Sequence, residues 1–205
     1  MPHFSPISLY DQQGKRKYLS SSERKKVYRA ILELTNERKV LFLLLLYWTG
    51  VRISEALSVT ADSVDHDEQV LIVKCLKKRD KIIYRRIPLP PTLLLRLKRL
   101  TKGEEQSFFP WSRRTAARYV KEIMNKCHIT GSQACAKGLR HSFAVHCVTQ
   151  NIPISLLSTW LGHSHISTTT IYLDIIGTEE RELAQRIWRY DGSKGASSFG
   201  KSNCV

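Results

Sequence analysis

Cysteine is sparse in this chain: its five copies are odd in number and form no C-x-x-C pair. This spacing argues against a disulfide framework or a zinc site and indicates the reducing cytosol. Apolar runs are also short, since the longest, VLFLLLLYW at residues 40–48, has nine residues, far fewer than the ~20 of a membrane helix. We expect it to form a buried core helix. The N-terminus has no apolar segment after its basic residues, so no signal peptide is predicted.

Acidic side chains are outnumbered by basic ones. The chain has 33 Lys and Arg against 18 Asp and Glu, which gives a formal charge of +15 and a pI near 9.8. Such an excess favours a polyanionic partner, most often nucleic acid, over a merely soluble basic protein. With 205 residues and 42% hydrophobic composition, the chain can bury one core.

The sequence divides into one domain and two irregular ends. Residues 1–19 carry little periodicity and are expected to be a basic, flexible lead-in. Residues 20–190 carry the pattern of one folded domain, whereas the Ser- and Gly-rich residues 191–205 are expected to be a disordered tail.

Helices dominate the predicted domain. Ser20 and Glu23 fit a capping box at the start of the first helix, and Gly50 suits the end of the second. Gly162 is expected to break the chain before Ser167, which would cap a short helix that holds Tyr172. The other predicted helices cover residues 52–59, a segment starting at Pro91, and residues 113–127, 138–150, 153–161 and 178–190. Ser112 is the expected cap of the helix at 113–127.

The hydrophobic period changes to that of a sheet in the middle of the chain. Residues 70–73 and 81–87 are predicted strands, and the basic segment 75–80 joins them. The fold class is therefore expected to be mainly α with a small antiparallel β-sheet, an α+β domain.

Four short segments hold basic residues and a tyrosine in a suggestive order. Taken singly, each of these residues has a structural explanation. Arg52, for example, stands three residues before Glu55 and can form a helix-surface ion pair, which stabilises little. Together the four are specific, with His163 nine residues before Tyr172. The segments are TGVRISE with Arg52, GLRHSF with Arg140, LGHS with His163 and TTIY with Tyr172.

This ordered set resembles the tyrosine recombinases, the lambda-integrase family, over roughly residues 20–190. The resemblance implies a tyrosine recombinase catalytic-domain fold and a site-specific DNA recombinase that uses no metal or other cofactor. Arg52 and Arg140 would hold the non-bridging oxygens of a phosphodiester, which planar guanidinium groups bind bidentately. Tyr172 would attack phosphorus, form a 3′-phosphotyrosine and free a 5′-hydroxyl, so that the bond is conserved for religation.

The leaving 5′-oxygen needs a proton, and the resemblance places the general-acid lysine between the two predicted strands. Lys77 is the expected residue because it stands four residues after Val73, the last apolar residue of the first strand, which is the spacing that the family pattern suggests. Lys78 and Lys81 stay open as alternatives. So does a basic hairpin that only touches the DNA backbone.

Lys137 departs from the family pattern, in which most members have a histidine three residues before the second arginine. A lysine donates to a non-bridging oxygen, but near pH 7 it is no base unless its pKa is strongly depressed. Lys137 is therefore assigned to phosphate stabilisation. His163 is expected to hydrogen-bond the phosphate, with proton acceptance from Tyr172 open to it because the ordinary pKa of histidine is ~6.5.

Two further histidines are expected to be structural. His141 follows Arg140 directly, and neighbours on a helix point about 100° apart, so the two should not face one phosphate. His146 is assigned in the same way.

The resemblance also bears on partners. Full-length integrases place a helical DNA-binding domain before the catalytic domain, and the first predicted helix near Ser20 leaves no room for one. A minimal recombinase, similar to those that invert fimbrial promoters, is therefore expected, cytoplasmic and associated with the nucleoid. Its expected partners are double-stranded DNA recombination sites, bound weakly and salt-sensitively by one protomer, further copies in a homotetramer on DNA, and accessory DNA-bending proteins. The helix at 178–190 would dock onto the adjacent protomer.

Two other activities remain open at this point. A type IB topoisomerase-like enzyme would use the same covalent chemistry to relax supercoils. A DNA-binding regulator would keep the fold without catalysis, which Lys137 and the missing domain allow. A metal-dependent nuclease is disfavoured because no cluster of acidic residues accompanies the phosphate site.

Overall fold

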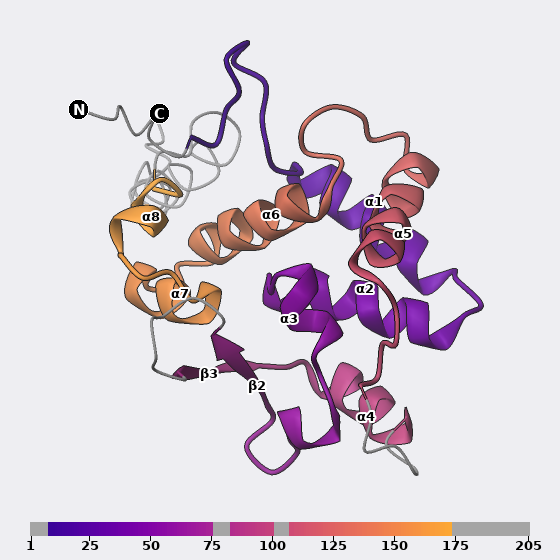
Figure 1. Cartoon of the computed structure of the whole chain (residues 1–205). Helices are drawn as coiled ribbons and strands as arrows, with labels where there is room; N and C mark the ends of the chain where they lie inside the picture. The colour runs from indigo at the N-terminus through magenta and orange to yellow at the C-terminus, as the bar shows by residue number, and fades with distance from the viewer. Residues whose placement is uncertain (1–7, 76–82, 101–106, 174–205) are drawn as a thin grey trace, which may run out of the picture.

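Helices are the main element of the residues that the structure describes, and one small sheet lies at one edge of them (Figure 1). The computed structural model describes residues 8–75, 83–100 and 107–173. The predicted fold class, mainly α with a small antiparallel sheet, is confirmed. The helices are α1 (Ser21–Leu32), α2 (Glu37–Thr49), α3 (Ile53–Leu57), α4 (Pro91–Leu100), α5 (Arg113–Lys126), α6 (Ala136–Thr149), α7 (Ile154–Leu161) and α8 (Ser167–Thr170), with a 3-10 turn, η1, at Ala61–Ser63.

The sheet has the order β1-β2-β3 and is antiparallel throughout, with β1 at Val64–Asp65, β2 at Val70–Cys75 and β3 at Ile83–Pro88. Leu71 pairs with Ile87, and Val73 pairs with Arg85. All four side chains are buried, because residues two apart on a strand face the same side. A charged side chain, Arg85, therefore points inward from β3.

The apolar run at residues 40–48 forms α2, and residues 40–47 are all buried, as predicted. This helix packs against α1, α4 and α6. It ends at Gly50, which adopts the left-handed conformation with φ 60°. A Cβ atom there would lie 2.5 Å from the Phe143 ring, so both the backbone angle and the packing require glycine.

Helix starts follow the predicted caps in two cases and differ in two. Ser20 with Glu23 forms the capping box of α1, and Ser112 caps α5. Helix α6 begins two residues earlier than predicted because the Sγ of Cys135 caps it, accepting from the Gly138 N–H at 3.5 Å. Ser167 does not cap α8, since it is already the first helical residue and Ile166 precedes it.

Tyr172 is correspondingly not inside a helix. Helix α8 ends at Thr170, and Tyr172 lies in the turn that follows. Its N–H donates to the Thr169 carbonyl at 3.1 Å, and its side chain is 1% exposed. Tyr172 is therefore positioned by a turn whose side chains pack against the apolar residues of α6 and α7.

The expected flexible lead-in is wrong for residues 8–19. Tyr10 and Arg16 form a β-bridge, and the Leu19 N–H donates to Ser142 Oγ on α6 at 2.6 Å. Leu9 and Tyr18 are 3% and 1% exposed and belong to an apolar cluster with residues of α6, α7 and the Tyr172 turn. The segment has no helical or strand period because single residues, widely spaced, supply its contacts.

Some predictions lie outside the described ranges. These are the general-acid candidates Lys77, Lys78 and Lys81, the helix at 178–190 and the tail at 191–205. Among the helices that are described, none has the length and apolar character needed to cross a membrane.

Candidate active site

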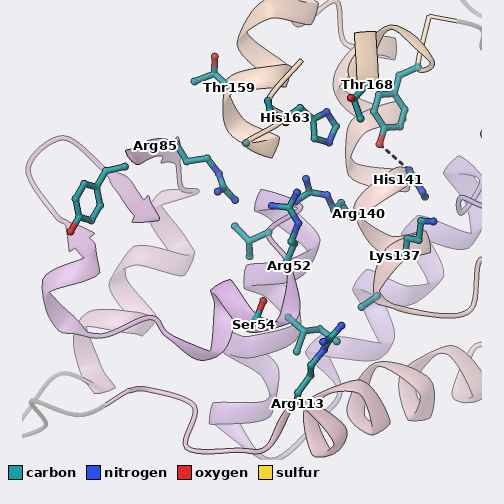
Figure 2. A pocket seen from close by; sticks show the side chains of 17 residues that line it. Arg52, Ser54, Arg85, Arg113, Lys137, Arg140, His141, Thr159, His163 and Thr168 are labelled. Carbon is teal, nitrogen blue, oxygen red and sulfur yellow. Dashed lines mark hydrogen bonds between the residues drawn. The ribbon is translucent and has the colours of Figure 1, made fainter. Parts of the chain in front are cut away.

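A pocket of roughly 730 Å³ opens between α3, β3, α6, α7 and the Tyr172 turn (Figure 2). It brings together every predicted site residue that the structure describes: Arg52, Lys137, Arg140, His163 and Tyr172. Arg85 and Arg113 add two further cations, and the residues that form its described wall include no Asp or Glu. The pocket is therefore suited to an anion.

Arg140 is fixed by the ends of two other helices. Its Nη1 donates to the Gly50 carbonyl at 2.7 Å and its Nη2 to the Leu161 carbonyl at 2.6 Å. These carbonyls end α2 and α7, where helix geometry leaves them without intrahelical partners. Burial and the positive charge of Arg52 lower the pKa of Arg140 to about 10, so it stays cationic at neutral pH.

Arg52 is the more accessible of the two arginines. Its backbone N–H donates to Glu55 Oε2 at 2.7 Å, and its Nη1 donates to Glu55 Oε1 at 2.8 Å. The Arg52 side chain remains 38% exposed, which leaves guanidinium donors available. Figure 2 shows its guanidinium beside that of Arg140, in keeping with the mutual effect of the two charges.

Glu55 and Arg85 are site residues that the sequence analysis missed. Arg85 donates to Glu55 Oε2 from Nη2 at 2.7 Å and to Oε1 from Nη1 at 3.2 Å. Both side chains are buried, at 1% exposure for Glu55 and 3% for Arg85. The Arg52–Glu55 pair thus exists as anticipated, but it is anchored in the interior and does not belong to a helix surface.

The Glu55 carboxylate is held ionised. Burial acts to raise its pKa, but the hydrogen bonds and charge of Arg85, together with Arg52, outweigh burial and leave the pKa below its usual value. Arg85 also donates from Nε to the Trp160 carbonyl at 2.8 Å. Glu55 and Arg85 therefore tie α3 and β3 to the end of α7. The burial of Arg85 had one signal in the sequence: Arg85 lies two residues before the apolar Ile87, on the same face of the strand.

His163 lies just past the left-handed Gly162 that ends α7. Its Nδ1 is 2.8 Å from Thr169 Oγ1, and its ring points toward Arg140 (Figure 2). Burial, then the charges of Arg140 and Arg52, lower the pKa of His163 to about 4. The imidazole is therefore neutral at pH 7, and its Nδ1 accepts from the Thr169 hydroxyl or donates to it according to the ring tautomer.

The hydroxyl of Tyr172 meets His141, which the sequence analysis assigned a structural role. His141 Nδ1 and Tyr172 Oη are 2.9 Å apart, the dashed line in Figure 2. The sequence analysis did not anticipate this contact. Acceptance of the Tyr172 proton by His163, which it left open, stays a prediction. His141 stands four residues after Lys137, which puts both on one helix face. His146, also assigned a structural role, does not line the pocket.

The two hydrogen-bonded groups are both neutral. Burial raises the pKa of Tyr172 to about 12, against the smaller opposing effect of Arg140. Burial also lowers the pKa of His141 to about 4, and Lys137 and Arg140 lower it further. The phenol thus needs a proton acceptor or a change of surroundings before it can react as phenolate.

The site holds the groups needed to bind a phosphodiester and to attack it. Guanidinium and ammonium donors can stabilise the charge that develops on non-bridging oxygens, and Tyr172, whose hydroxyl is of a type that can attack phosphorus, lines the same pocket. Across residues 8–75, 83–100 and 107–173, no three His, Cys, Asp or Glu side chains gather as metal ligands would.

Known proteins are similar to this chain in sequence. The model of the phage integrase family matches residues 17–177. Tyrosine recombinase XerA of Pyrococcus horikoshii is 31% identical over 183 residues, which are 83% of this chain and 61% of that protein. A tyrosine recombinase of Thermosipho africanus is 27% identical over 177 residues, with the same coverage of 83% and 61%.

Solved structures share the fold. A crystal structure of XerA recombinase has a TM-score of 0.70 at 22% identity and covers 83% of this chain and 64% of its own. XerH bound to a palindromic difH substrate, a post-cleavage complex, has a TM-score of 0.69 at 23% identity, covering 90% and 57%. The catalytic domain of bacteriophage HP1 integrase reaches 0.61 at 19% identity, covering 82% and 93%.

The chain spans about 61% of the length of the first curated relatives it matches. The family match extends from residue 17 to residue 177 and includes α1 to α8 and the sheet. On this evidence of sequence and fold, the chain belongs to the phage integrase family, the tyrosine recombinases.

Proposed function

We propose that the protein is a site-specific DNA recombinase that cleaves and rejoins strands through a covalent 3′-phosphotyrosine at Tyr172. The observation that carries this proposal is that Tyr172 lines a pocket whose described wall has five Arg and Lys side chains and no carboxylate. A phosphodiester supplies the matching charge. A covalent intermediate conserves the energy of the broken bond for religation.

The four basic site residues that the sequence predicts and the structure describes each have a proposed part in the reaction. Arg52 and Arg140 would bind the non-bridging oxygens, and removal of either would slow cleavage by on the order of 10²–10³, as for an oxyanion-hole donor. Lys137 would donate to the same phosphate from the first turn of α6. His163 would donate to it from Nε2, since its neutral ring is oriented through Nδ1 by Thr169.

Lys77 would protonate the leaving 5′-oxygen, with Lys78 and Lys81 as alternatives; all three lie outside the described residues. A substrate with sulfur at the 5′-bridging position tests this role, because a thiolate leaves without a proton. We expect Lys77→Ala to cleave normal DNA slowly and the sulfur-containing DNA at the wild-type rate. Equal defects on both substrates would assign the lysine to phosphate binding.

The proposed partners are double-stranded recombination sites and other copies of this chain. Exchange between two duplexes breaks four strands, so a homotetramer on DNA would supply the four tyrosines, with accessory DNA-bending proteins assisting its assembly at the nucleoid. A relative in this fold, XerH, has been solved bound to its difH substrate. Crosslinking on DNA that yields dimers at most would contradict the tetramer.

Trapping on a nicked suicide duplex tests the proposal. A binding site is first selected from a random-sequence DNA library by retention of the DNA that the protein binds, whether or not an adduct forms. We expect an SDS-stable protein–DNA adduct that forms in EDTA and is absent with Tyr172→Phe. Tyr84→Phe is the matched control, because Tyr84 also lines the pocket but is 60% exposed.

Two outcomes would contradict the proposal. An adduct that persists in Tyr172→Phe would place the nucleophile elsewhere, and selection of a bound site without any adduct would favour a DNA-binding regulator. A plasmid with two copies of the site then separates recombination, which inverts or excises the intervening DNA, from relaxation alone.

A further inference from the structure

We infer that His141 is a catalytic residue of this reaction, the group that takes the proton from the Tyr172 hydroxyl as it attacks phosphorus. This inference rests on the proposed function, since it assigns a role within the same strand cleavage. The family pattern leads one to expect a base three residues before Arg140, but this chain has Lys137 there.

The geometry is that of a nucleophile and its base. His141 Nδ1 and Tyr172 Oη are 2.9 Å apart, within the 2.6–3.2 Å reach expected of such a pair. The ring centroids are 5.8 Å apart and the planes are inclined by 53°, so the contact is made through the polar atoms. His141 is 6% exposed and Tyr172 1%. Bulk water therefore has little access to the shared proton.

The protonation states fit the role. Burial is the main cause of the low pKa of His141, about 4, so its ring is neutral and can accept a proton at pH 7. The charged groups that act on it are Lys137 and Arg140 on its own helix and Lys17 from the segment before α1. The imidazole of His163 also faces this region.

Other residues of the site are less suited to accept the proton. The Lys137 ammonium has donors but no lone pair. His163 directs its Nδ1 to Thr169 Oγ1 at 2.8 Å. Arg140 is a permanent donor whose Nη atoms bond two backbone carbonyls. Of Lys137, Arg140, His163 and His141, only His141 has a described hydrogen bond with the Tyr172 hydroxyl.

The step balances as follows. The Tyr172 oxygen forms a bond to phosphorus while its proton moves to His141 Nδ1. The bond from phosphorus to the 5′-oxygen breaks with its electron pair on that oxygen, which takes a proton from the general acid. Religation reverses each transfer, so His141 returns the proton to the departing Tyr172 oxygen.

Phosphate binding would raise the basicity of His141 when it is needed. The negative phosphate, held between Lys137 and Arg140, opposes the two cations that disfavour imidazolium. His141 Nε2 is buried and has no hydrogen-bond partner among the described residues. The imidazolium is thus poorly stabilised before DNA binds, which keeps the free enzyme in the accepting form.

The test is single-turnover cleavage of the suicide duplex by His141→Asn between pH 6 and pH 9. The Asn side-chain oxygen can take the place of Nδ1 as an acceptor but cannot hold the proton. We expect a rate about 10²–10³ lower at pH 7, typical of a lost general base. We also expect a rise of about tenfold per pH unit, because the rate then follows the fraction of Tyr172 that is already ionised, and the pKa of this phenol is raised to about 12. The wild-type rate should change little over this range.

Two controls separate chemistry from folding. His146→Asn alters a half-buried histidine on the same helix outside the pocket and should keep the wild-type rate and pH profile. Incorporation of 3-fluorotyrosine at position 172, a more acidic phenol, should restore much of the cleavage lost in His141→Asn. If His141→Asn does not fold, His141→Gln is measured in the same way.

A wild-type rate and pH profile in a folded His141 variant would overturn the inference. So would a defect of constant size at every pH that fluorotyrosine does not relieve, which would make His141 a structural support. In either case a Tyr172-dependent adduct formed by the wild-type protein would leave the proposed function standing. Absence of that adduct would instead remove the proposed function.

Discussion

Arg52 and Arg140 have the same chemistry but different attachments to the protein. Arg140 closes the C-terminal ends of α2 and α7 through the Gly50 and Leu161 carbonyls. Arg52 is partly exposed and shares Glu55 with Arg85. Arg140 is therefore expected to stabilise the fold as well as to bind the proposed phosphate, whereas Arg52 is expected to act mainly on the phosphate.

Alanine substitutions should separate these roles. Arg140→Ala leaves two carbonyls without their donors, and we expect a loss in unfolding free energy of about 1–3 kcal/mol for each. Arg52→Ala should cost about 0–1 kcal/mol, because its ion pair is partly exposed and Glu55 keeps Arg85. Both should lose adduct formation. Urea denaturation measures the stabilities, and equal losses would contradict the distinction.

Between elements, the buried ion pair of Glu55 and Arg85 joins α3 to β3. Removing one partner of a buried pair leaves the other charge uncompensated, so Glu55→Gln should destabilise the protein by about 3–5 kcal/mol. Glu33→Gln is the matched control, because the Glu33–Lys126 pair is 63% and 46% exposed, and should change stability by less than about 1 kcal/mol. Urea denaturation at pH 7 measures both, and a Glu55 effect as small as that of Glu33 would contradict this account.

The end of α2 gives a second test between elements. Gly50 has φ 60° and lies against Phe143 of α6, whereas Gly14 has φ 73° with open space around it. Gly14→Ala should cost about 1–2 kcal/mol for the left-handed conformation alone. Gly50→Ala should cost about 1–3 kcal/mol more, because the added carbon overpacks the contact with Phe143. Thermal unfolding of both variants measures the difference, and similar midpoints would contradict it.

At the scale of the whole molecule, three of the described histidines are held neutral: the pKa values of His141, His146 and His163 are lowered to about 4, mainly by burial. A histidine with a depressed folded pKa contributes stability above its unfolded pKa of ~6.5, and this contribution is lost as the pH falls toward 4. We expect the unfolding free energy to fall by several kcal/mol between pH 6.5 and pH 4. Denaturant titrations at several pH values measure the loss, and imidazole NMR signals of three neutral rings at pH 5.5 identify its source. A stability independent of pH in this window would contradict the expectation.

Local sequence was sufficient for much of the architecture. Ser20 with Glu23, Ser112, Gly50 and Gly162 mark helix ends through interactions within a few residues, and the structure places them as predicted. The apolar run of α2 likewise indicated its own burial. Such features can be read from the chain because the atoms that interact are close in sequence.

The order of Arg52, Arg140, His163 and Tyr172 was enough to indicate the family and to name most of the pocket. It did not indicate that Arg85 would pair with Glu55, 30 residues away, or that His141 would meet Tyr172, 31 residues away. Nor did it predict the burial of Tyr18. These contacts depend on how strands, helices and turns pack in space, because a side chain's protonation and role are set by its neighbours in the folded protein.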